Sequence, residues 1–163
     1  MPIAESLITW VHLISASIWV GGSIFIGIVL APMLKSLANA VEERTVLMIM
    51  IGRRFNKVAL PALVVLVATG IYKAHVVLAS PDILLGSNYG TILVIKIIVV
   101  ASMIVLFSIH VKISDVSKEK MLPSGYPDAK IMKVRSKIIW LGRIIVGQSI
   151  AILLFAALMD GGI

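Results

Sequence analysis

Two histidines and one lysine, each set in an apolar stretch, are the residues of this chain best suited to chemistry. His12 lies in the run TWVHLISASIWVGG, and His75 and Lys96 lie in two later apolar runs. A neutral imidazole is a ligand for haem iron or copper, and an ammonium group pairs with an anionic group. Because burying such side chains among apolar neighbours is costly without a partner, we take these three as the first candidates for a site.

The residues around His12 suit a tightly packed helix interface. Trp19 follows His12 by seven residues, and seven steps of roughly 100° nearly close two helical turns, so both share one face. Ser15 and Gly22 lie on the same face, where small residues allow a neighbouring helix to approach closely. We expect Ser15 and Gly22 to leave room for a flat ring bound by His12, and Trp19 to pack near the edge of that ring.

The composition is that of an integral membrane protein. Of the 163 residues, 60% are hydrophobic and 14% are charged, and the mean hydropathy is +1.07. A soluble domain is close to half apolar and about a quarter charged. The absence of cysteine excludes disulfides, thiolate zinc sites and iron–sulfur clusters. We expect membrane lipids, a quinone or porphyrin-type substrate and a second copy of the chain as partners.

The net charge of +7 does not indicate nucleic acid, because the charges fall in segments between apolar runs, as the positive-inside rule requires. Five Lys or Arg residues lie in 35–57 and seven in 112–137, whereas Lys73 is the one basic residue near the opposite ends of the spans. We therefore predict a cell-membrane protein with both termini outside and both basic loops, 35–57 and 112–137, in the cytoplasm.

Four apolar segments are long enough to cross a bilayer, which takes about 20 helical residues. The first is longer than the apolar core of a signal peptide, so we expect it to be retained, and Pro32 should end it. Ser80–Gly90 should form a polar loop. Residues 44–57 either continue into the second span or form an interfacial helix. We predict an all-α integral membrane protein, an antiparallel four-transmembrane-helix bundle forming one domain over residues 1–163, with spans at roughly 7–31, 58–79, 91–111 and 138–159.

Counting residues from the ends of these spans places three polar side chains at one depth. His12, His75 and Lys96 each lie four or five residues inside a span, roughly 6–8 Å below the outer surface. We predict that His12 and His75 ligate the iron of one low-spin haem b, and that Lys96, the catalytic candidate, directs its charge toward an anionic group beside them. The alternatives are a core His12 bonded to a carbonyl or a serine, a His75 facing headgroups, and a Lys96 that snorkels to the interface.

A second set of candidates lies near the inner side. His110 follows Lys96 by two heptads, on the same face but roughly 21 Å deeper, and is either an interfacial residue or a further metal ligand. Arg143 lies at a similar depth and is expected to contact a cofactor or a lipid phosphate. Copper competes with haem as the bound metal. Cu(I) prefers thiolate and thioether ligands, and this chain has no cysteine and no cluster of methionines, so ligand chemistry alone favours haem.

Four segments in order carry a resemblance to a known family: WVHLISASIWVGG, RRFNKVALPALVVLVATGIYKA, YGTILVIKIIVV and RSKIIWLGRIIVGQSIAILLF. Together they resemble the CopD-like membrane domain superfamily, which includes the copper-resistance CopD proteins and the HemJ-type protoporphyrinogen oxidases. The resemblance implies a four-helix membrane bundle that often carries haem b. The first-helix histidine of the family matches His12, and its third-helix lysine matches Lys96.

The resemblance leaves two lines of function open. In HemJ-type proteins the matched residues belong to a site linked to porphyrinogen oxidation, whereas CopD-type proteins are associated with copper uptake or handling. Gly21 and Gly22 after Trp19 are nearer the CopD form, and RIIVGQS stands where HemJ-type chains carry an Asn-Glu-Val-Pro-like stretch.

We predict a haem b-binding membrane oxidoreductase or electron-transfer protein, linked to a porphyrinogen or to quinol and quinone, with its haem between helices near the outer face. The alternative is a copper uptake or handling protein. A third hypothesis is a haem-free subunit that only packs against partners.

Overall fold

The computed structural model describes residues 2–37, 41–121 and 129–161, and within them the chain is helical and contains no strand. Residues 38–40 and 122–128, in the two basic loops, lie outside the described residues. The elements in chain order are α1 (Pro2–Ala16), η1 (Ser17–Gly21), α2 (Gly22–Ile24), η2 (Phe25–Leu30), α3 (Ala31–Leu37), α4 (Val41–Leu78), α5 (Pro81–Gly86), α6 (Asn88–Met121) and α7 (Ala129–Asp160). The short η1 and η2 are π-helical turns, so α1 to α3 form one long helix.

Four of the resulting helices are long and apolar enough to cross a membrane. Their spanning stretches are Ile3–Leu37, Glu43–Leu78, Asn88–Asp115 and Arg135–Asp160. A helix satisfies its backbone hydrogen bonds internally, which is what the hydrocarbon interior demands of a spanning segment. The prediction of an all-α membrane protein with four spanning helices is confirmed.

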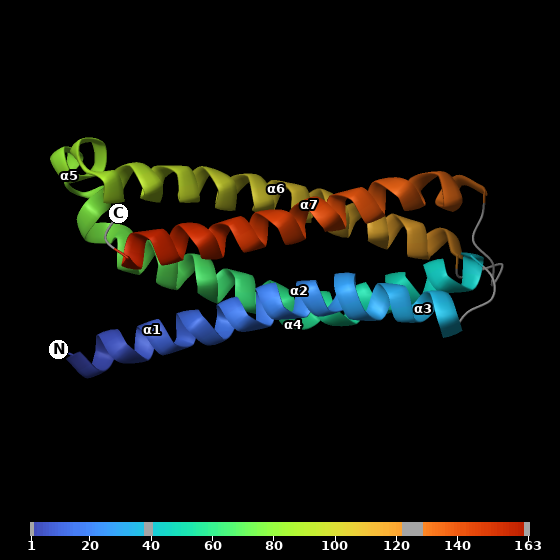
Figure 1. Ribbon diagram of the computed structural model, residues 1–163. Helices are drawn as coiled ribbons and strands as arrows, with labels where there is room; N and C mark the ends of the chain where they lie inside the picture. The colour runs from blue at the N-terminus through green and yellow to red at the C-terminus, as the bar shows by residue number, and fades with distance from the viewer. Residues whose placement is uncertain (1, 38–40, 122–128, 162–163) are drawn as a thin grey trace.

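The helices alternate in direction and form two antiparallel pairs (Figure 1). The first long helix packs along α4, and α6 packs along α7 over most of its length. Both ends of the chain lie at the same end of the bundle as α5, and α3 and α6 end, and α4 and α7 begin, at the opposite end. We refer to these ends as outer and inner, because the charge bias predicts this orientation.

The structure differs from the predicted boundaries in two places and decides between the two alternatives for residues 44–57. The first helix runs through Pro32 to Leu37. A proline removes only one backbone donor, and π-type turns such as the preceding η2 help to accommodate it within a membrane helix. The segment 44–57 continues directly into the second span, because α4 is one helix from Val41 to Leu78 with Pro61 inside it.

The connection Ser80–Gly90, expected to be a polar loop, contains the short helix α5 instead. Its start carries the usual signals of a helix N-terminus. Pro81 occupies the first turn, where its missing N–H is not needed, and the Ser80 carbonyl accepts hydrogen bonds from Ile83 and Leu84 at 3.1 and 2.9 Å.

The core of the bundle is narrow and lies at mid-depth, where all four long helices contribute. Trp19 from the first helix packs edge-on against Phe107 of α6, with ring centroids 4.8 Å apart at 78°. The other buried side chains of this cluster come from the same four helices: Val20, Ala59, Leu63, Met103 and Ile145. Most other large apolar side chains are exposed, as expected of helices that face lipid.

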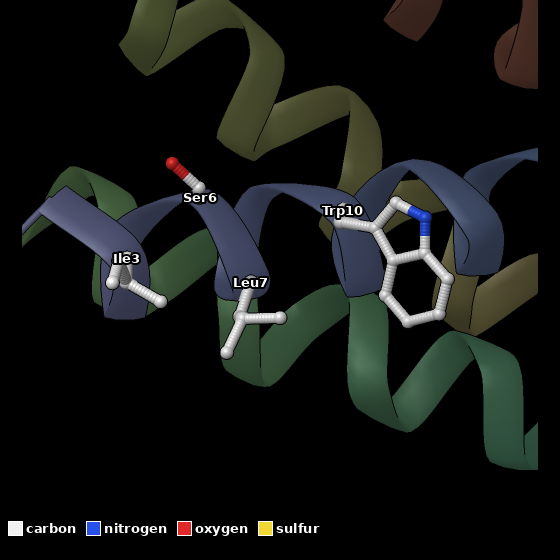
Figure 2. A pocket seen from close by; sticks show the side chains of 4 residues that line it. All are labelled: Ile3, Ser6, Leu7 and Trp10. Atoms are coloured by element: carbon white, nitrogen blue, oxygen red, sulfur yellow. The ribbon is translucent and has the colours of Figure 1, made fainter.

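One shallow hollow of about 560 Å³ lies at the outer end of α1, lined by Ile3, Ser6, Leu7 and Trp10 (Figure 2). The three apolar side chains are exposed, and all four lining residues come from one helix. A hollow of this kind faces lipid and is separate from the polar groups described below.

Candidate functional site

His12 lies half-buried on α1, where this helix packs against α4. Its Nδ1 is 2.7 Å from the Oγ1 of Thr69. The Thr69 hydroxyl donates its single proton to the carbonyl oxygen of Val65 at 2.6 Å, so toward the imidazole it acts as an acceptor. With the Thr69 proton assigned to Val65, Nδ1 of His12 is the donor, and in the neutral ring the lone pair is on Nε2.

Two ammonium groups lie near this imidazole. Lys96 is half-buried on α6, and both Lys96 and Lys73 lie within Coulombic range of His12. Lys73 is exposed and donates a hydrogen bond to Thr9 Oγ1 at 3.2 Å. Three helices thus bring a lone-pair ligand and two positive charges together in the outer half of the bundle. We call His12, Thr69, Lys73 and Lys96 the outer polar site.

The structure does not bring His75 to His12. Lys73 and Thr69 face α1, and His75 follows Lys73 by two residues, or about 200° around the helix. The His75 side chain is exposed, its Nδ1 lies 2.5 Å from the carbonyl oxygen of Tyr72, and its ring lies 5.5 Å from that of Tyr72. One chain therefore does not present two imidazoles to opposite faces of one haem, since equal depth does not imply a shared face.

The other residues expected around a haem serve in helix packing. Ser15 is buried, and Trp19 is buried and donates its indole N–H to Ser149 Oγ at 3.0 Å. A Cβ added to Gly22 would overlap the ring of Phe55 on α4, so this ring already occupies the space expected to admit a macrocycle.

The inner candidates differ in their surroundings. Arg143 is exposed on α7. His110 is partly buried on α6 and faces α7, where a Cβ on Gly142 would lie 3.8 Å from its Cε1. The Nδ1 of His110 is buried and has no hydrogen-bond partner among the described residues.

Sequence reasoning missed three polar residues inside the spans. Thr69 orients His12, Ser149 accepts the indole proton of Trp19, and Gln148 donates to Ser102 Oγ at 2.7 Å. Each is an uncharged polar residue in an otherwise apolar segment. Thr69 is ten residues from the outer end of its predicted span and His12 is five residues inside its own, so the depth count alone would not have paired them.

The site is sparse in metal ligands. Across residues 2–37, 41–121 and 129–161 no group of three or more His, Cys, Asp or Glu side chains converges. A metal at the outer polar site would take one protein ligand, the Nε2 of His12, and would complete its coordination with small exchangeable ligands. This arrangement suits an ion in passage better than a permanently held structural ion.

Comparison with known proteins places these features in a family context. The family model of copper resistance protein D (CopD) matches residues 49–159. Copper transport protein CutJ of Bacillus subtilis (strain 168) is 33% identical over 104 residues, which are 64% of this chain and 18% of that protein. The match thus spans less than a fifth of the length of this relative. No solved structure matches the chain.

Proposed function

The chain belongs to the copper resistance protein D (CopD) family, and from this premise we propose that it binds Cu(I) at His12 and moves it across the membrane. The similarity to a protein named for copper transport supports copper as the cargo. The predicted resemblance to CopD-type proteins is confirmed by the family match. This match favours the alternative prediction, a copper-handling protein, over the haem oxidoreductase.

The observation that carries the proposal is the orientation of the His12 ring. Metal-binding histidines usually donate their second ring N–H to a fixed acceptor, which sets the tautomer and leaves the other nitrogen for the metal. Thr69 Oγ1 is such an acceptor for Nδ1–H, and its own proton is engaged by Val65. Nε2 of His12 is thereby held ready as an imidazole ligand, a type that copper accepts well.

The two lysines favour a copper ion that binds transiently over one that is held permanently. Positive charges at Lys73 and Lys96 raise the electrostatic energy of a cation at His12 and make it easier to release. They also favour an anionic small ligand that arrives with the metal and completes its coordination. Cu(I) suits such a site better than Cu(II), because a single charge is less costly to place in an apolar bundle.

The test is a titration of the purified protein with Cu(I) under anaerobic conditions, in competition with a coloured Cu(I) chelator. We expect one equivalent to bind, and His12→Phe to lower its affinity at least tenfold. His75→Phe is the matched control, since this ring is exposed and should leave the affinity within twofold. Unchanged binding by the His12 variant would reject the site.

Haem b is the second candidate, and the observation that favours it is the same pair of ammonium groups, which would pair with haem propionates. Such a haem would be bound by His12 alone within one chain, which would leave its second axial position open. A visible spectrum of protein from haem-replete cells separates the candidates. We expect a colourless protein that retains copper, whereas haem absorption bands lost in Lys96→Met would favour haem.

A further inference from the structure

Two buried acceptor atoms without partners lie between α6 and α7. Among the described residues, the buried side-chain polar atoms that lack a hydrogen bond are Nδ1 of His110 and Oε1 of Gln148. The Gln148 amide is oriented by Ser102, whose hydroxyl proton goes to the Val99 carbonyl at 2.8 Å, so that its oxygen accepts from Nε2 of Gln148. The amide oxygen is therefore the unpaired atom.

The His110 ring has its Nδ1 buried without a hydrogen-bond partner among the described residues, and we take the ring as the neutral tautomer protonated on Nε2. Nδ1 then carries a buried lone pair. A lone pair left unpaired in an apolar interior is unfavourable, and native proteins keep few of them. What both atoms lack is a cation or a proton donor.

His110 is the inner end of a regular stripe along α6. Lys96, Met103 and His110 are separated by seven residues each, so they share a face at steps of about 10 Å. Lys96 lies near His12, which fixes the outer end of the stripe at the outer polar site. Met103 is buried at mid-depth, with Sδ 3.5 Å from the hydroxyl oxygen of Ser149.

We propose that Met103 and His110 are successive Cu(I) ligands on a path that leads from His12 along α6 to the inner end of the bundle. This inference rests on the proposed function, because it assigns the inner half of the same route. A bare ion does not cross an apolar interior, so a ligand is needed at each level. Thioether sulfur and imidazole nitrogen are ligands that copper accepts.

Two neighbours complete this route. The ring of Phe107 lies between Met103 and His110 in sequence and is buried in the core, where an aromatic face attracts a cation. The Gln148 amide donates from Nε2 to Ser102, the residue before Met103 on α6, and its unpaired Oε1 would offer the ion a polar contact at mid-depth. The metal stays Cu(I) along the path and no electron is transferred; between Met103 and His110, about 10 Å apart, its contacts would be the Phe107 ring and the Gln148 oxygen.

The experiment measures Cu(I) uptake into proteoliposomes that contain a trapped Cu(I) chelator, together with Cu(I) affinity in detergent. We expect Met103→Leu and His110→Leu each to lower the uptake rate at least tenfold while the His12-dependent affinity stays within twofold. Met33→Leu is the matched control, since Met33 is 50% exposed and lies off this stripe. His110→Met, which restores a soft ligand, should recover at least half of the uptake.

The outcomes separate the two proposals. Uptake that requires His12 but is unchanged in Met103→Leu and His110→Leu would overturn the path and leave the proposed function in place. Failure of His110→Met to recover uptake lost in His110→Leu would also overturn it, because the loss would then reflect packing. Absence of uptake by the unmodified protein would overturn the proposed function and the path with it.

Discussion

Replacing Thr69 by valine isolates the orientation of His12 from every other feature of the outer polar site. Valine keeps the branched shape of threonine but removes the oxygen that accepts the Nδ1 proton at 2.7 Å. The imidazole then has no fixed acceptor on this side. Its proton is free to occupy Nε2, where it blocks the lone pair that the metal requires.

The expected size follows from the geometry of this bond. The contact is short, and both partners are half-buried between α1 and α4, so water replaces the lost acceptor poorly. Losing an oriented partner behind a metal ligand typically lowers metal affinity about 10- to 100-fold. This corresponds to roughly 1.4–2.7 kcal/mol, within the range for a buried polar group left unpaired.

The assay is the anaerobic Cu(I) competition titration, applied to Thr69→Val, Thr69→Ser and Thr91→Val. The serine variant keeps the hydroxyl and should bind within about threefold of the unmodified protein. The Thr91 hydroxyl donates to the carbonyl of Ser87, which directly precedes α6, at 3.1 Å, so Thr91→Val should not change the affinity. Wild-type affinity in Thr69→Val, alongside a clear loss in His12→Phe, would refute the tautomer argument.

Three further predictions concern packing and topology. Gly22→Ala should lower the free energy of unfolding by about 1–3 kcal/mol, because the added methyl group overlaps the Phe55 ring. Gly27→Ala is the control, since a methyl group at Gly27 meets open space and should leave this free energy unchanged. Both are measured by unfolding in detergent. Ser149→Ala should lower the free energy of unfolding by about 1–3 kcal/mol, because the buried indole N–H of Trp19 loses its acceptor. Ser108→Ala is the control, since it loses only a hydrogen bond to the carbonyl of Ile104 on an exposed turn of the same helix. A cysteine in place of the exposed Ser36 should not react with an impermeant thiol reagent added to intact cells, but should react in inside-out vesicles. Labelling of this cysteine in intact cells would contradict the predicted topology.

Much of the fold could be predicted because a bilayer imposes strong constraints. Long uncharged runs and basic segments between them were enough to predict four spanning helices, since few other structures satisfy the backbone in hydrocarbon. The helix ends were less predictable. Pro32 and Pro61 break helices in water, but both lie inside helices here. Whether a proline ends a helix depends on the surroundings of that helix in the bundle, which single-residue propensities do not include.

The sequence was enough to predict the depth of the site residues in the membrane, but not the direction in which their side chains point. Counting residues from the span ends brought His12 and Lys96 to one level, and the structure places them in electrostatic reach. The same count also selected His75, which points away because depth along a helix and angle around it are independent. The role of Thr69 depends on a hydrogen bond between helices, which requires their relative rotation to be known.

We expect the ion pair at the inner end and the lysines at the outer end to set the depth of the bundle in the bilayer. Arg53 of α4 and Asp115 of α6 are 3.3 Å apart. Along α4, Lys73 lies twenty residues beyond Arg53, and along α6, Lys96 lies nineteen residues from Asp115, so each helix carries charges about 30 Å apart. This spacing equals the hydrocarbon thickness of a typical bilayer. A thicker membrane must draw the outer ammonium groups inward and a thinner one must release them to water, so lipid chain length acts directly on the charge beside His12.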